Sequence, residues 1–391
     1  MTDTWFLAAL WLGLALAASL LSIWLRIATA LSEIVVGAIA QLLIGAFLGG
    51  ITLGSSESWV GFLAGTGAIV LTFLAGAELD PHILRRKWKE SLAIGLASFA
   101  APFFGCAAIA YWGLGWSVEA SWLAGIAMST TSVAVVYAVM LEFGFNATDY
   151  GKTVLAACFV TDLATVLALG FIFAPFSMRT LVFFAVSLVV FAIMPWVTPR
   201  FFKRYGSRPS ELEAKFLLFW LFALGGLAAW ADSEAVLPAY LMGMVLAGTV
   251  GKDHALIRRL RTLTFGLLTP FYFIRAGSLV SMQAIVAAPM ALFVLLFAKM
   301  FTKVAGVYPL ARFYKSPRQE AAYTTLLMST GLTFGTISAL FGLSHKVIDQ
   351  AQYSYLVAAV IGSAVVPTLI ANAFFLPRHL LREDQESSKS T

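Results

Sequence analysis

The chain has 391 residues, of which 60% are hydrophobic and only 12% are charged, and its formal net charge is +6. A soluble domain is nearer half apolar and a quarter charged, and so few polar side chains could not cover the surface around a single soluble core. The composition therefore excludes a cytosolic enzyme, a nucleic-acid-binding protein and a disordered chain, and it predicts an all-α polytopic membrane protein.

Apolar runs long enough to span a bilayer recur along the whole sequence. A helix needs about 20 apolar residues to cross the hydrocarbon core. We count about thirteen such runs: 5–25, 29–50, 58–78, 91–113, 120–141, 151–174, 180–199, 214–231, 235–250, 262–281, 285–308, 319–342 and 350–376. The first run has no basic leader before it, so we expect it to be retained as a span. Residues 378–391 are expected to form a short cytoplasmic tail.

The distribution of basic residues supports this count. Cytoplasmic loops of membrane proteins carry an excess of Lys and Arg. With the N-terminus outside, the outer loops hold only Arg179 and Lys346 of the 26 basic residues. Three more, Arg275, Lys299 and Lys303, lie within apolar runs, and all the others fall on the inner side. We therefore expect a cytoplasmic C-terminus, and the basic surplus reflects topology and not a nucleic-acid partner.

Two acidic residues stand out in the apolar runs. Glu33 lies near the start of the second run, where it has either a structural hydrogen-bonding role or a role in an ion path. Asp162 is the only acid near the middle of a long run, in AACFVTDLATVLALG. Ionisable groups at membrane depth are costly and usually functional. A carboxyl group that ionises near ambient pH holds either a proton or a small cation such as Na⁺, and the adjacent Thr161 offers a further oxygen ligand.

Clusters of small polar residues interrupt the fifth and twelfth runs. The fifth contains Ser129, Thr130, Thr131 and Ser132, and the twelfth contains Ser329, Thr330, Gly331 and Thr333. Either cluster alone is compatible with ordinary packing between membrane helices. The two runs are seven spans apart and so run in opposite directions, which is what an inverted repeat with two broken helices would produce. We therefore expect the two clusters to meet near the bilayer midplane.

Several motifs resemble those of a known family. LSEIVVGAIAQLLIG, GAIVLTFLAGAELD, MSTTSVAVVYAVMLEFG, FVTDLATV, PFYFIRAGSLV and KVAGVYPLAR occur in the order found in bacterial cation:proton antiporters of the NapA and Kef type, which share the NhaA fold. The resemblance covers nearly the whole chain. It implies a homodimer of thirteen-span protomers, each with inverted repeats and two crossed discontinuous helices.

The resemblance also implies roles for particular segments. Residues 91–175 and 285–376 would form an ion-translocating core that moves like an elevator against a dimerisation scaffold of residues 5–78 and 180–281. The transported cation would bind at Asp162, beside a helix crossing made by the two polar clusters. The oxygen ligands and crossing residues implied are Thr161, Thr130 and Ser129, with Thr131, Ser132, Thr330, Gly331 and Thr333. Lys303 falls at the position of the family's membrane lysine.

Two departures from the family pattern, at Thr161 and Arg275, qualify these roles. Thr161 stands where electrogenic relatives carry a second aspartate, so we expect one proton per sodium ion and no net charge transfer. Lys303 then either supports Asp162 or caps a broken helix, and Lys299, four residues earlier, lies on the same helix face. Arg275 replaces a small residue; it is expected to pair with Glu33 or a helix end, or alternatively to gate the cation path.

The sequence thus predicts an antiporter that exchanges Na⁺, or Li⁺, for H⁺ across the bacterial inner membrane. K⁺/H⁺ exchange is an alternative, because selectivity depends on cavity size and ligand number. A sodium-coupled organic anion symporter on the same fold is a third hypothesis. We expect no enzymatic activity and no cofactor; the expected partners are Na⁺ or another monovalent cation, H⁺, the lipid bilayer and a second copy of the chain.

Overall fold

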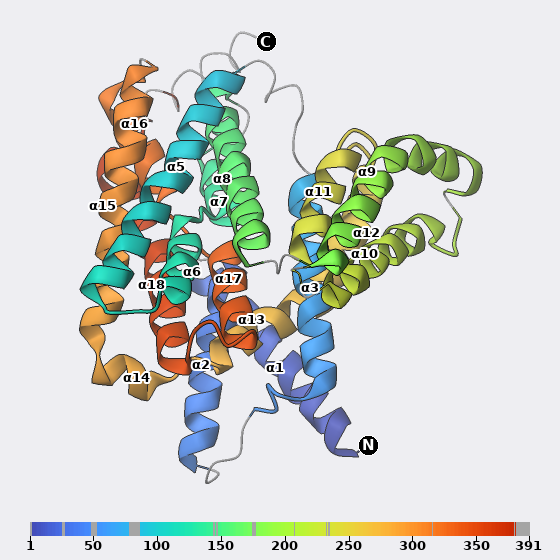
Figure 1. Cartoon of the computed structure of the whole chain (residues 1–391), viewed down its shortest axis with the longest axis horizontal. Coiled ribbons are helices and arrows are strands. Elements are labelled where there is room, and N and C mark those ends of the chain that lie inside the picture. Colours follow the sequence, from blue (N-terminus) through green and yellow to red (C-terminus); the bar gives the residue numbers. More distant parts are fainter. Residues whose placement is uncertain are drawn as a thin grey trace. The chain divides into compact units, whose positions relative to one another are not determined.

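A computed structural model describes residues 2–25, 28–47, 53–77, 87–143, 145, 148–173, 177–206, 208–231, 233, 235–314, 316–378 and 380. Most of the proposed tail, residues 378–391, lies outside the described residues. Within these ranges the regular structure is entirely helical, and no strand occurs (Figure 1).

The described helices follow the apolar runs. In chain order they are α1 (Thr2–Leu25), α2 (Thr29–Phe47), α3 (Ser58–Ala77), α5 (Trp88–Ala108), α6 (Val118–Ser129), α7 (Val133–Glu142), α8 (Asp149–Phe173), α9 (Met178–Tyr205), α10 (Leu212–Trp230), α11 (Val236–Leu246), α12 (His254–Leu263), α13 (Thr269–Ser278), α14 (Met282–Ala287), α15 (Pro289–Phe313), α16 (Arg318–Met328), α17 (Thr333–Ser344) and α18 (Gln350–Ile370). Among the described residues, nine helical segments are long and apolar enough to cross a membrane. Each of the thirteen apolar runs contains helix among its described residues.

The helix ends show why the segments begin where they do. Ser117 accepts a hydrogen bond from the Ala120 amide at the start of α6, and Ser177 does the same for the Thr180 amide at the start of α9. Asp349 and Gln352 form a capping box at the start of α18. Such side chains satisfy amide groups that lack a partner in the first helical turn.

A short amphipathic helix, α12, occupies a stretch that the sequence analysis assigns to an inner loop. The Asp253 side chain caps it by accepting a hydrogen bond from the Leu256 amide at 3.0 Å. Leu256, Ile257 and Leu260 are buried on one face of the helix. The basic residues of the segment therefore project from a folded helix and not from an irregular loop.

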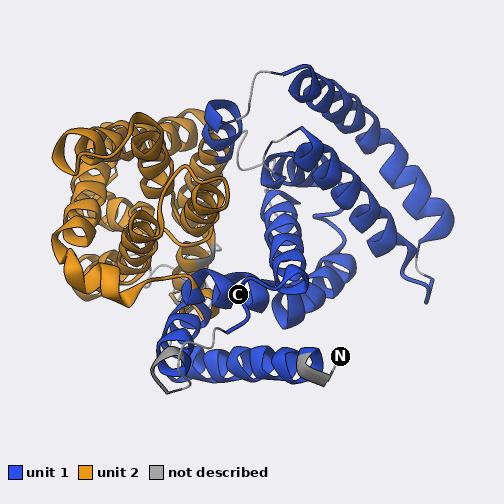
Figure 2. Ribbon diagram, turned by 60° about the horizontal axis from the view of Figure 1, so that its bottom comes forward, with its two compact units in different colours: residues 1–24, 32–81, 166–278 blue, residues 25–31, 82–165, 279–391 orange. Residues whose placement is uncertain are grey.

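The chain divides into two compact units (Figure 2). Unit 1 comprises Met1–Trp24, Ser32–Pro81 and Val166–Ser278, and unit 2 comprises Leu25–Leu31, His82–Thr165 and Leu279–Thr391. The boundary between the units falls inside α8, between Thr165 and Val166. The core and scaffold segments expected from the sequence stay a prediction.

Glycines allow the helices of unit 1 to pack closely. A Cβ atom at Gly76 of α3 would collide with the Tyr240 carbonyl of α11, and one at Gly243 would collide with the Phe73 carbonyl. Gly277 of α13 lies against the Ile34 carbonyl of α2 in the same way. Close backbone approach through small residues is a common means of joining membrane helices.

In unit 2, α15 is the central element around which the candidate site is built. It packs against α5, α16 and α18, while α6 packs against α5 and α17. This arrangement brings one face of α15, which carries Lys299 and Lys303, to the ends of the short helices α6 and α16.

Candidate functional site

Two interrupted helices contact each other within unit 2. The first interruption separates α6, which ends at Ser129, from α7, which begins at Val133; the second separates α16 from α17, which begins at Thr333. The Ser132 amide donates a 3.1 Å hydrogen bond to the Thr330 carbonyl. The Thr131 hydroxyl donates to the Met328 carbonyl at 2.9 Å. The two polar clusters noted in the sequence are therefore hydrogen-bonded to one another.

Asp162 lies in the uninterrupted helix α8 and is buried, with only 2% of its surface exposed. Its Oδ1 atom has no hydrogen-bond partner in the described part of the protein. A buried carboxylate without partners is unfavourable unless it is neutralised by a proton or a cation. These surroundings favour neutralisation of the Asp162 carboxyl group by a proton or a small cation.

Hydroxyl groups connect α8 to the neighbouring helices. The Thr161 hydroxyl oxygen lies 3.1 Å from the Gly95 carbonyl oxygen of α5 and 3.0 Å from the Ala157 carbonyl oxygen, and its single hydrogen is shared between these two acceptors. Thr165 donates to the Thr161 carbonyl at 2.9 Å, and its Oγ1 atom lies 3.5 Å from Ser129 Oγ. Ser129, at the first interruption, is thereby joined to α8 about one turn beyond Asp162.

Lys303 caps the carboxyl end of α6. Its Nζ atom is fully buried and donates to Ser98 Oγ at 2.7 Å, to the Ser129 carbonyl at 2.8 Å and to Thr131 Oγ1 at 3.0 Å. An ammonium group has three N–H donors, and all three are used. A positive charge at a helix C-terminus also complements the helix dipole. No salt bridge joins Lys303 to Asp162 among the described residues.

Lys299 lies one turn earlier on α15 and has a different environment. It too is fully buried, but its Nζ atom has no hydrogen-bond partner among the described residues. The ammonium group lies directly against Gly331, in the second interruption. The two lysines of α15 therefore reach different interruptions.

Arg275 and Glu33 both belong to unit 1, but within the described residues no ion pair connects them. Arg275 Nε instead donates a 2.9 Å hydrogen bond to the Ser55 carbonyl in the segment that precedes α3. Ser55 Oγ also lies 2.7 Å from Ser278 Oγ. Glu33 is buried, with 3% of its surface exposed. The structure therefore shows a loop carbonyl, and not Glu33, as the partner of Arg275 among the described residues. Pairing with a helix end and a role in gating the cation path stay predictions.

Three hydroxyl residues at the interruptions were not recognised in the sequence. Ser98 receives a hydrogen bond from Lys303, Thr165 lies near Ser129, and Ser363 of α18 donates to the Gly331 carbonyl at 3.4 Å. A single hydroxyl in an apolar helix is common, so none of them gives a distinctive sequence signal. Thr165 alone has a spacing signal, because it lies three residues after Asp162 and so falls on a similar face of α8.

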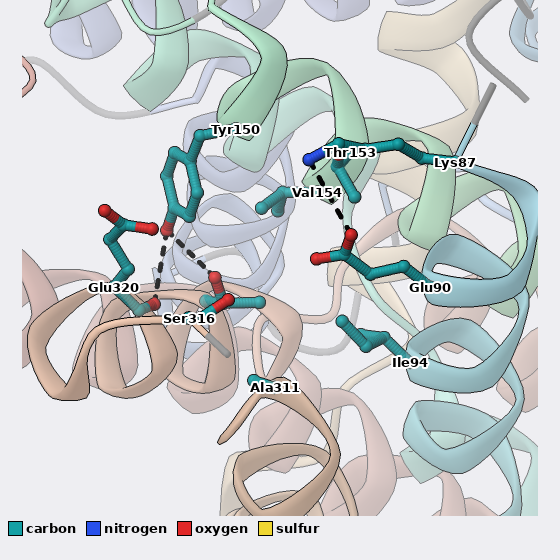
Figure 3. A pocket seen from close by; sticks show the side chains of 10 residues that line it. Lys87, Glu90, Ile94, Tyr150, Thr153, Val154, Ala311, Ser316 and Glu320 are labelled. Carbon is teal, nitrogen blue, oxygen red and sulfur yellow. Dashed lines mark hydrogen bonds and ion pairs between the residues drawn. The ribbon is translucent and has the colours of Figure 1, made fainter. Parts of the chain in front are cut away.

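A small pocket of about 90 Å³ lies elsewhere in unit 2, where the N-terminal ends of α5, α8 and α16 meet the end of α15 (Figure 3). Tyr150 Oη lies 2.9 Å from Thr324 Oγ1 on one side of it. On the other side Lys87 and Glu90 form an ion pair with a 3.7 Å separation. The distribution of basic loops predicts that this end of the helices lies on the cytoplasmic side.

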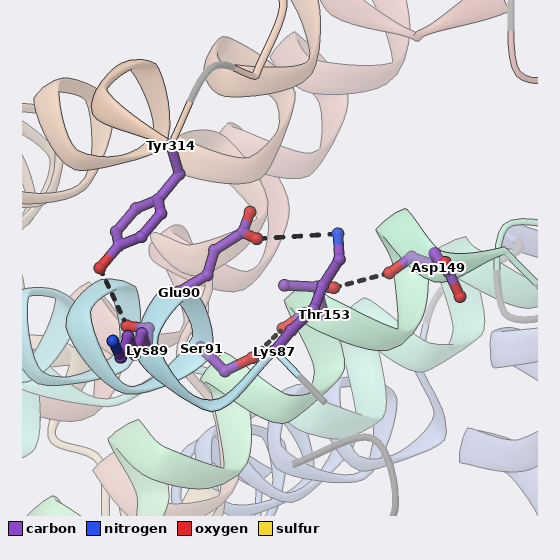
Figure 4. Close-up of polar contacts among 7 residues, drawn as sticks. All are labelled: Lys87, Lys89, Glu90, Ser91, Asp149, Thr153 and Tyr314. Carbon is purple, nitrogen blue, oxygen red and sulfur yellow. Dashed lines mark hydrogen bonds and ion pairs between the residues drawn. The ribbon is translucent and has the colours of Figure 1, made fainter. Parts of the chain in front are cut away.

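Hydrogen bonds to backbone carbonyls tie the helices around this pocket together. Ser91 donates to the Thr153 carbonyl, and Tyr314 donates to the Lys89 carbonyl (Figure 4). The pocket contains charges of both signs. In the part of the chain that the structure describes, no group of three or more His, Cys, Asp or Glu side chains is placed to hold a metal ion.

Comparisons with known proteins relate this arrangement to cation transport. The chain is 25% identical over 358 residues to a Na⁺/H⁺ antiporter of Enterococcus hirae, covering 86% of this chain and 91% of the relative. It is 26% identical over 359 residues to the glutathione-regulated potassium-efflux system protein KefC of Cronobacter sakazakii, covering 85% of this chain and 56% of the relative. It spans 45% of the length of Cation/H⁺ antiporter 17 of Arabidopsis thaliana, with 25% identity.

The fold is that of a solved antiporter. The sodium proton antiporter MjNhaP1 from Methanocaldococcus jannaschii superimposes with a TM-score of 0.71 over 95% of this chain and 96% of the other, at 15% sequence identity. At that identity the match establishes the fold alone. The profile of the family described as "Sodium/hydrogen exchanger, transmembrane" matches residues 7–376. The chain, a multi-pass membrane protein, therefore belongs to the sodium/hydrogen exchanger family.

Proposed function

We propose that this protein exchanges Na⁺, or Li⁺, for H⁺, with a 1:1 stoichiometry, and that Asp162 binds either the cation or the proton. The observation that carries the proposal is the burial of Asp162 with an unpartnered Oδ1 atom beside two interrupted helices. A carboxyl group in such surroundings must be neutralised, and a proton and a sodium ion are alternative ways to neutralise it.

Exchange follows from this competition if the site faces one side of the membrane at a time. A cation displaces the proton on one side, and a proton displaces the cation on the other. Sodium is a hard cation that binds oxygen ligands. Ser129, Thr130 and Thr161 are the proposed additional ligands, and Asp162 supplies the only acid near the centre of a long apolar run.

The proposal includes an architecture and a location. We take all thirteen apolar runs to be spans of an NhaA-type fold with inverted repeats, in which α6–α7 and α16–α17 are the two crossed discontinuous helices. Residues 91–175 and 285–376 act as a moving core, and residues 5–78 and 180–281 act as the scaffold of a homodimer. The protein resides in the bacterial inner membrane, with its N-terminus outside and its C-terminus in the cytoplasm, as the basic loops favour.

A second candidate function is K⁺/H⁺ exchange. It is favoured by the similarity to KefC, which is named as a potassium-efflux protein. The two functions share the same chemistry at Asp162 and differ only in the preferred cation. Titration of Na⁺, Li⁺ and K⁺ in one transport assay decides between them.

The test is the substitution Asp162→Asn in proteoliposomes that contain a pH-sensitive dye. The amide cannot exchange a proton for a cation, so we expect cation-dependent proton movement to fall to the level of empty liposomes. Asp149→Asn is the matched control, because it removes an exposed acid from the same helix. Exchange that persists in a folded Asp162→Asn protein would refute the site and with it the proposed function.

A further inference from the structure

The two free cysteines of the chain have different surroundings. Cys106 of α5 and Cys158 of α8 are both buried, with no exposed surface. The Cys158 thiol donates a hydrogen bond to the thioether of Met328, with 3.5 Å between Sγ and Sδ. Cys106 has no sulfur atom as a hydrogen-bond partner in the described part of the chain. Unit 2 thus contains a buried thiol–thioether pair at one cysteine and a second buried thiol without such a partner.

The sulfur pair lies beside the proposed transport site. Cys158 precedes Asp162 by four residues on α8, so the two side chains project from the same face of that helix. Met328 is the last residue of α16, at the second interruption, and its carbonyl accepts the hydrogen bond of the Thr131 hydroxyl. All four residues belong to unit 2. The pair therefore joins α8 to the point where the two interrupted helices are hydrogen-bonded to each other.

The ligands that this pair offers differ in kind from the oxygens proposed as ligands for Na⁺. Soft monovalent ions such as Cu⁺ and Ag⁺ bind the sulfur atoms of Cys and Met, whereas hard ions prefer oxygen. A metal–thiolate bond is about 2.3 Å long in zinc sites, so one ion can contact both sulfurs across the observed 3.5 Å separation in a bent arrangement. Methionine is unbranched and flexible, so its sulfur can also move back to admit a larger ion.

We propose that Cys158 and Met328 form an inhibitory binding site for soft monovalent cations, with Ag⁺ as the representative ion. The access route rests on the proposed function. Ag⁺ carries a single charge and is intermediate in size between Na⁺ and K⁺, so a path that admits either ion to Asp162 also admits Ag⁺. On binding, the Cys158 S–H bond breaks, a sulfur–silver bond forms and the proton is released to water, while the Met328 sulfur donates a lone pair to the same ion.

Occupation of the pair should stop exchange because the surrounding side chains are tightly packed. Cys158 and Met328 lie in one hydrophobic cluster with the buried Val154 and Leu327. Close-packed interiors have few voids that could take an additional ion. Insertion of the ion therefore displaces the end of α16, and the hydrogen bond at the Met328 carbonyl transmits this displacement to Thr131 of the first interruption. The crossing of the two interrupted helices would no longer keep the geometry that the transported ion requires.

The first experiment measures the silver that purified, detergent-solubilised protein retains after gel filtration in chloride-free buffer with a large excess of sodium nitrate. In a Cys106→Ser background we expect about one Ag⁺ per protomer, with two sulfur ligands in its X-ray absorption spectrum. Cys158→Ala in this background should retain no silver. Met328→Leu conserves the side-chain volume but removes one soft ligand, so it should weaken silver binding by about tenfold or more.

Two results of this experiment would overturn the proposal. One is silver retained at full stoichiometry by the Cys158→Ala protein, which would place the ion elsewhere. The other is an unchanged silver affinity in Met328→Leu, which would leave a single reactive thiol in place of a two-sulfur site. If Cys158→Ala does not fold, the Met328→Leu comparison and the number of sulfur ligands in the absorption spectrum still decide.

The second experiment measures exchange in proteoliposomes with a pH-sensitive dye in nitrate medium. We expect Ag⁺ to abolish exchange by the Cys106→Ser protein, and we expect dithiothreitol, which removes silver from thiolates, to restore it. Exchange by Cys158→Ala in the same background should be insensitive to Ag⁺. Equal inhibition of the Cys158→Ala protein, or full exchange by silver-loaded Cys106→Ser protein, would refute the inhibitory role.

These outcomes are distinct from a failure of the proposed function. Both sulfur ligands are present in Asp162→Asn, so this variant should still retain about one Ag⁺ per protomer in the Cys106→Ser background. Exchange by Asp162→Asn would refute the role of Asp162 and leave the silver measurement unaffected. Normal exchange by a Cys106→Ser protein that retains no silver would instead refute the sulfur site alone.

Discussion

At Asp162 the protein keeps a carboxyl group away from water without giving its Oδ1 atom a hydrogen bond. Lys303, the cation that the sequence places in the same region, makes its three hydrogen bonds elsewhere. This is the basis on which we propose that a mobile cation or a proton neutralises Asp162. This differs from a buried salt bridge, in which one side chain permanently neutralises the other.

Competition at one carboxyl group predicts how sodium affinity depends on pH. Protons occupy Asp162 increasingly as the pH falls, so the apparent affinity for Na⁺ must weaken in acid and level off in alkali. In the range where the proton dominates, the change approaches about tenfold per pH unit, because one proton is displaced by one cation. Half-saturating sodium concentrations measured in proteoliposomes at a series of pH values test this. A value that stays constant across the active range would contradict shared occupancy.

The substitution Lys303→Ala should damage stability more than cation selectivity. It removes three hydrogen bonds from a charged donor and leaves the Ser129 carbonyl uncapped. We expect a loss of roughly 2–4 kcal/mol in the free energy of unfolding, given the usual strength of charge-assisted hydrogen bonds. The melting temperature in detergent and the preference among Na⁺, Li⁺ and K⁺ should be measured on the same preparation. Lys203→Ala is the control, because Lys203 is exposed. A large change in cation preference with an unchanged melting temperature would instead indicate that Lys303 acts directly at the cation site.

The sequence was informative about which residues are unusual and less so about their partners. The position of Asp162 in an apolar run marked it as a candidate, and the polar clusters marked both interruptions. Lys299 and Lys303 lie on one helix face, so spacing alone could not show that they reach different interruptions. The partner of Arg275 is a backbone carbonyl, Ser55, and every residue supplies such a carbonyl, so no side-chain pattern could identify it.

At the scale of helices, apolar length predicted the elements well because the bilayer sets a minimum span. Each run contains helix, while the amphipathic α12 was missed because it is short and basic. Packing depends on features that periodicity does not reveal. Gly76 and Gly243 permit α3 and α11 of unit 1 to approach closely, yet other glycines of α3, such as Gly61 and Gly65, have open space around them.

This contrast makes a prediction about helix packing. Gly76→Ala and Gly243→Ala should each lower stability by about 1–3 kcal/mol, as overpacking does, because a methyl group would overlap a backbone carbonyl that cannot rotate away. Gly61→Ala and Gly65→Ala in α3 are the controls, because no atom lies within 4 Å of the added methyl group. Melting temperatures of the four variants decide the matter. Equal melting of all four would show that α3 and α11 separate at little cost.

At the scale of the whole molecule, the proposed function links the charge balance of transport to the number of central acids. In the proposed function, Thr161 beside Asp162 leaves one carboxyl group to exchange one proton for one monovalent cation. We therefore expect no net charge to cross the membrane in a cycle. A sodium gradient should drive rapid Na⁺/H⁺ exchange, as detected with a pH-sensitive dye. Under the same gradient, the transport current recorded on solid-supported membranes should stay at background level. A steady current that reverses with membrane potential at fixed gradients would show a different stoichiometry.

The bonds between the two interruptions constrain how the site could open. Ser132 and Thr131 of the first interruption are hydrogen-bonded to Thr330 and Met328 of the second, so neither segment can swing aside as an independent gate without breaking buried bonds. Access to the site from either side of the membrane would then change through movement of the two interrupted helices together. A disulfide engineered between the interruptions would accordingly leave the rate of exchange unchanged. The same disulfide would stop exchange if one interrupted segment had to move independently of the other.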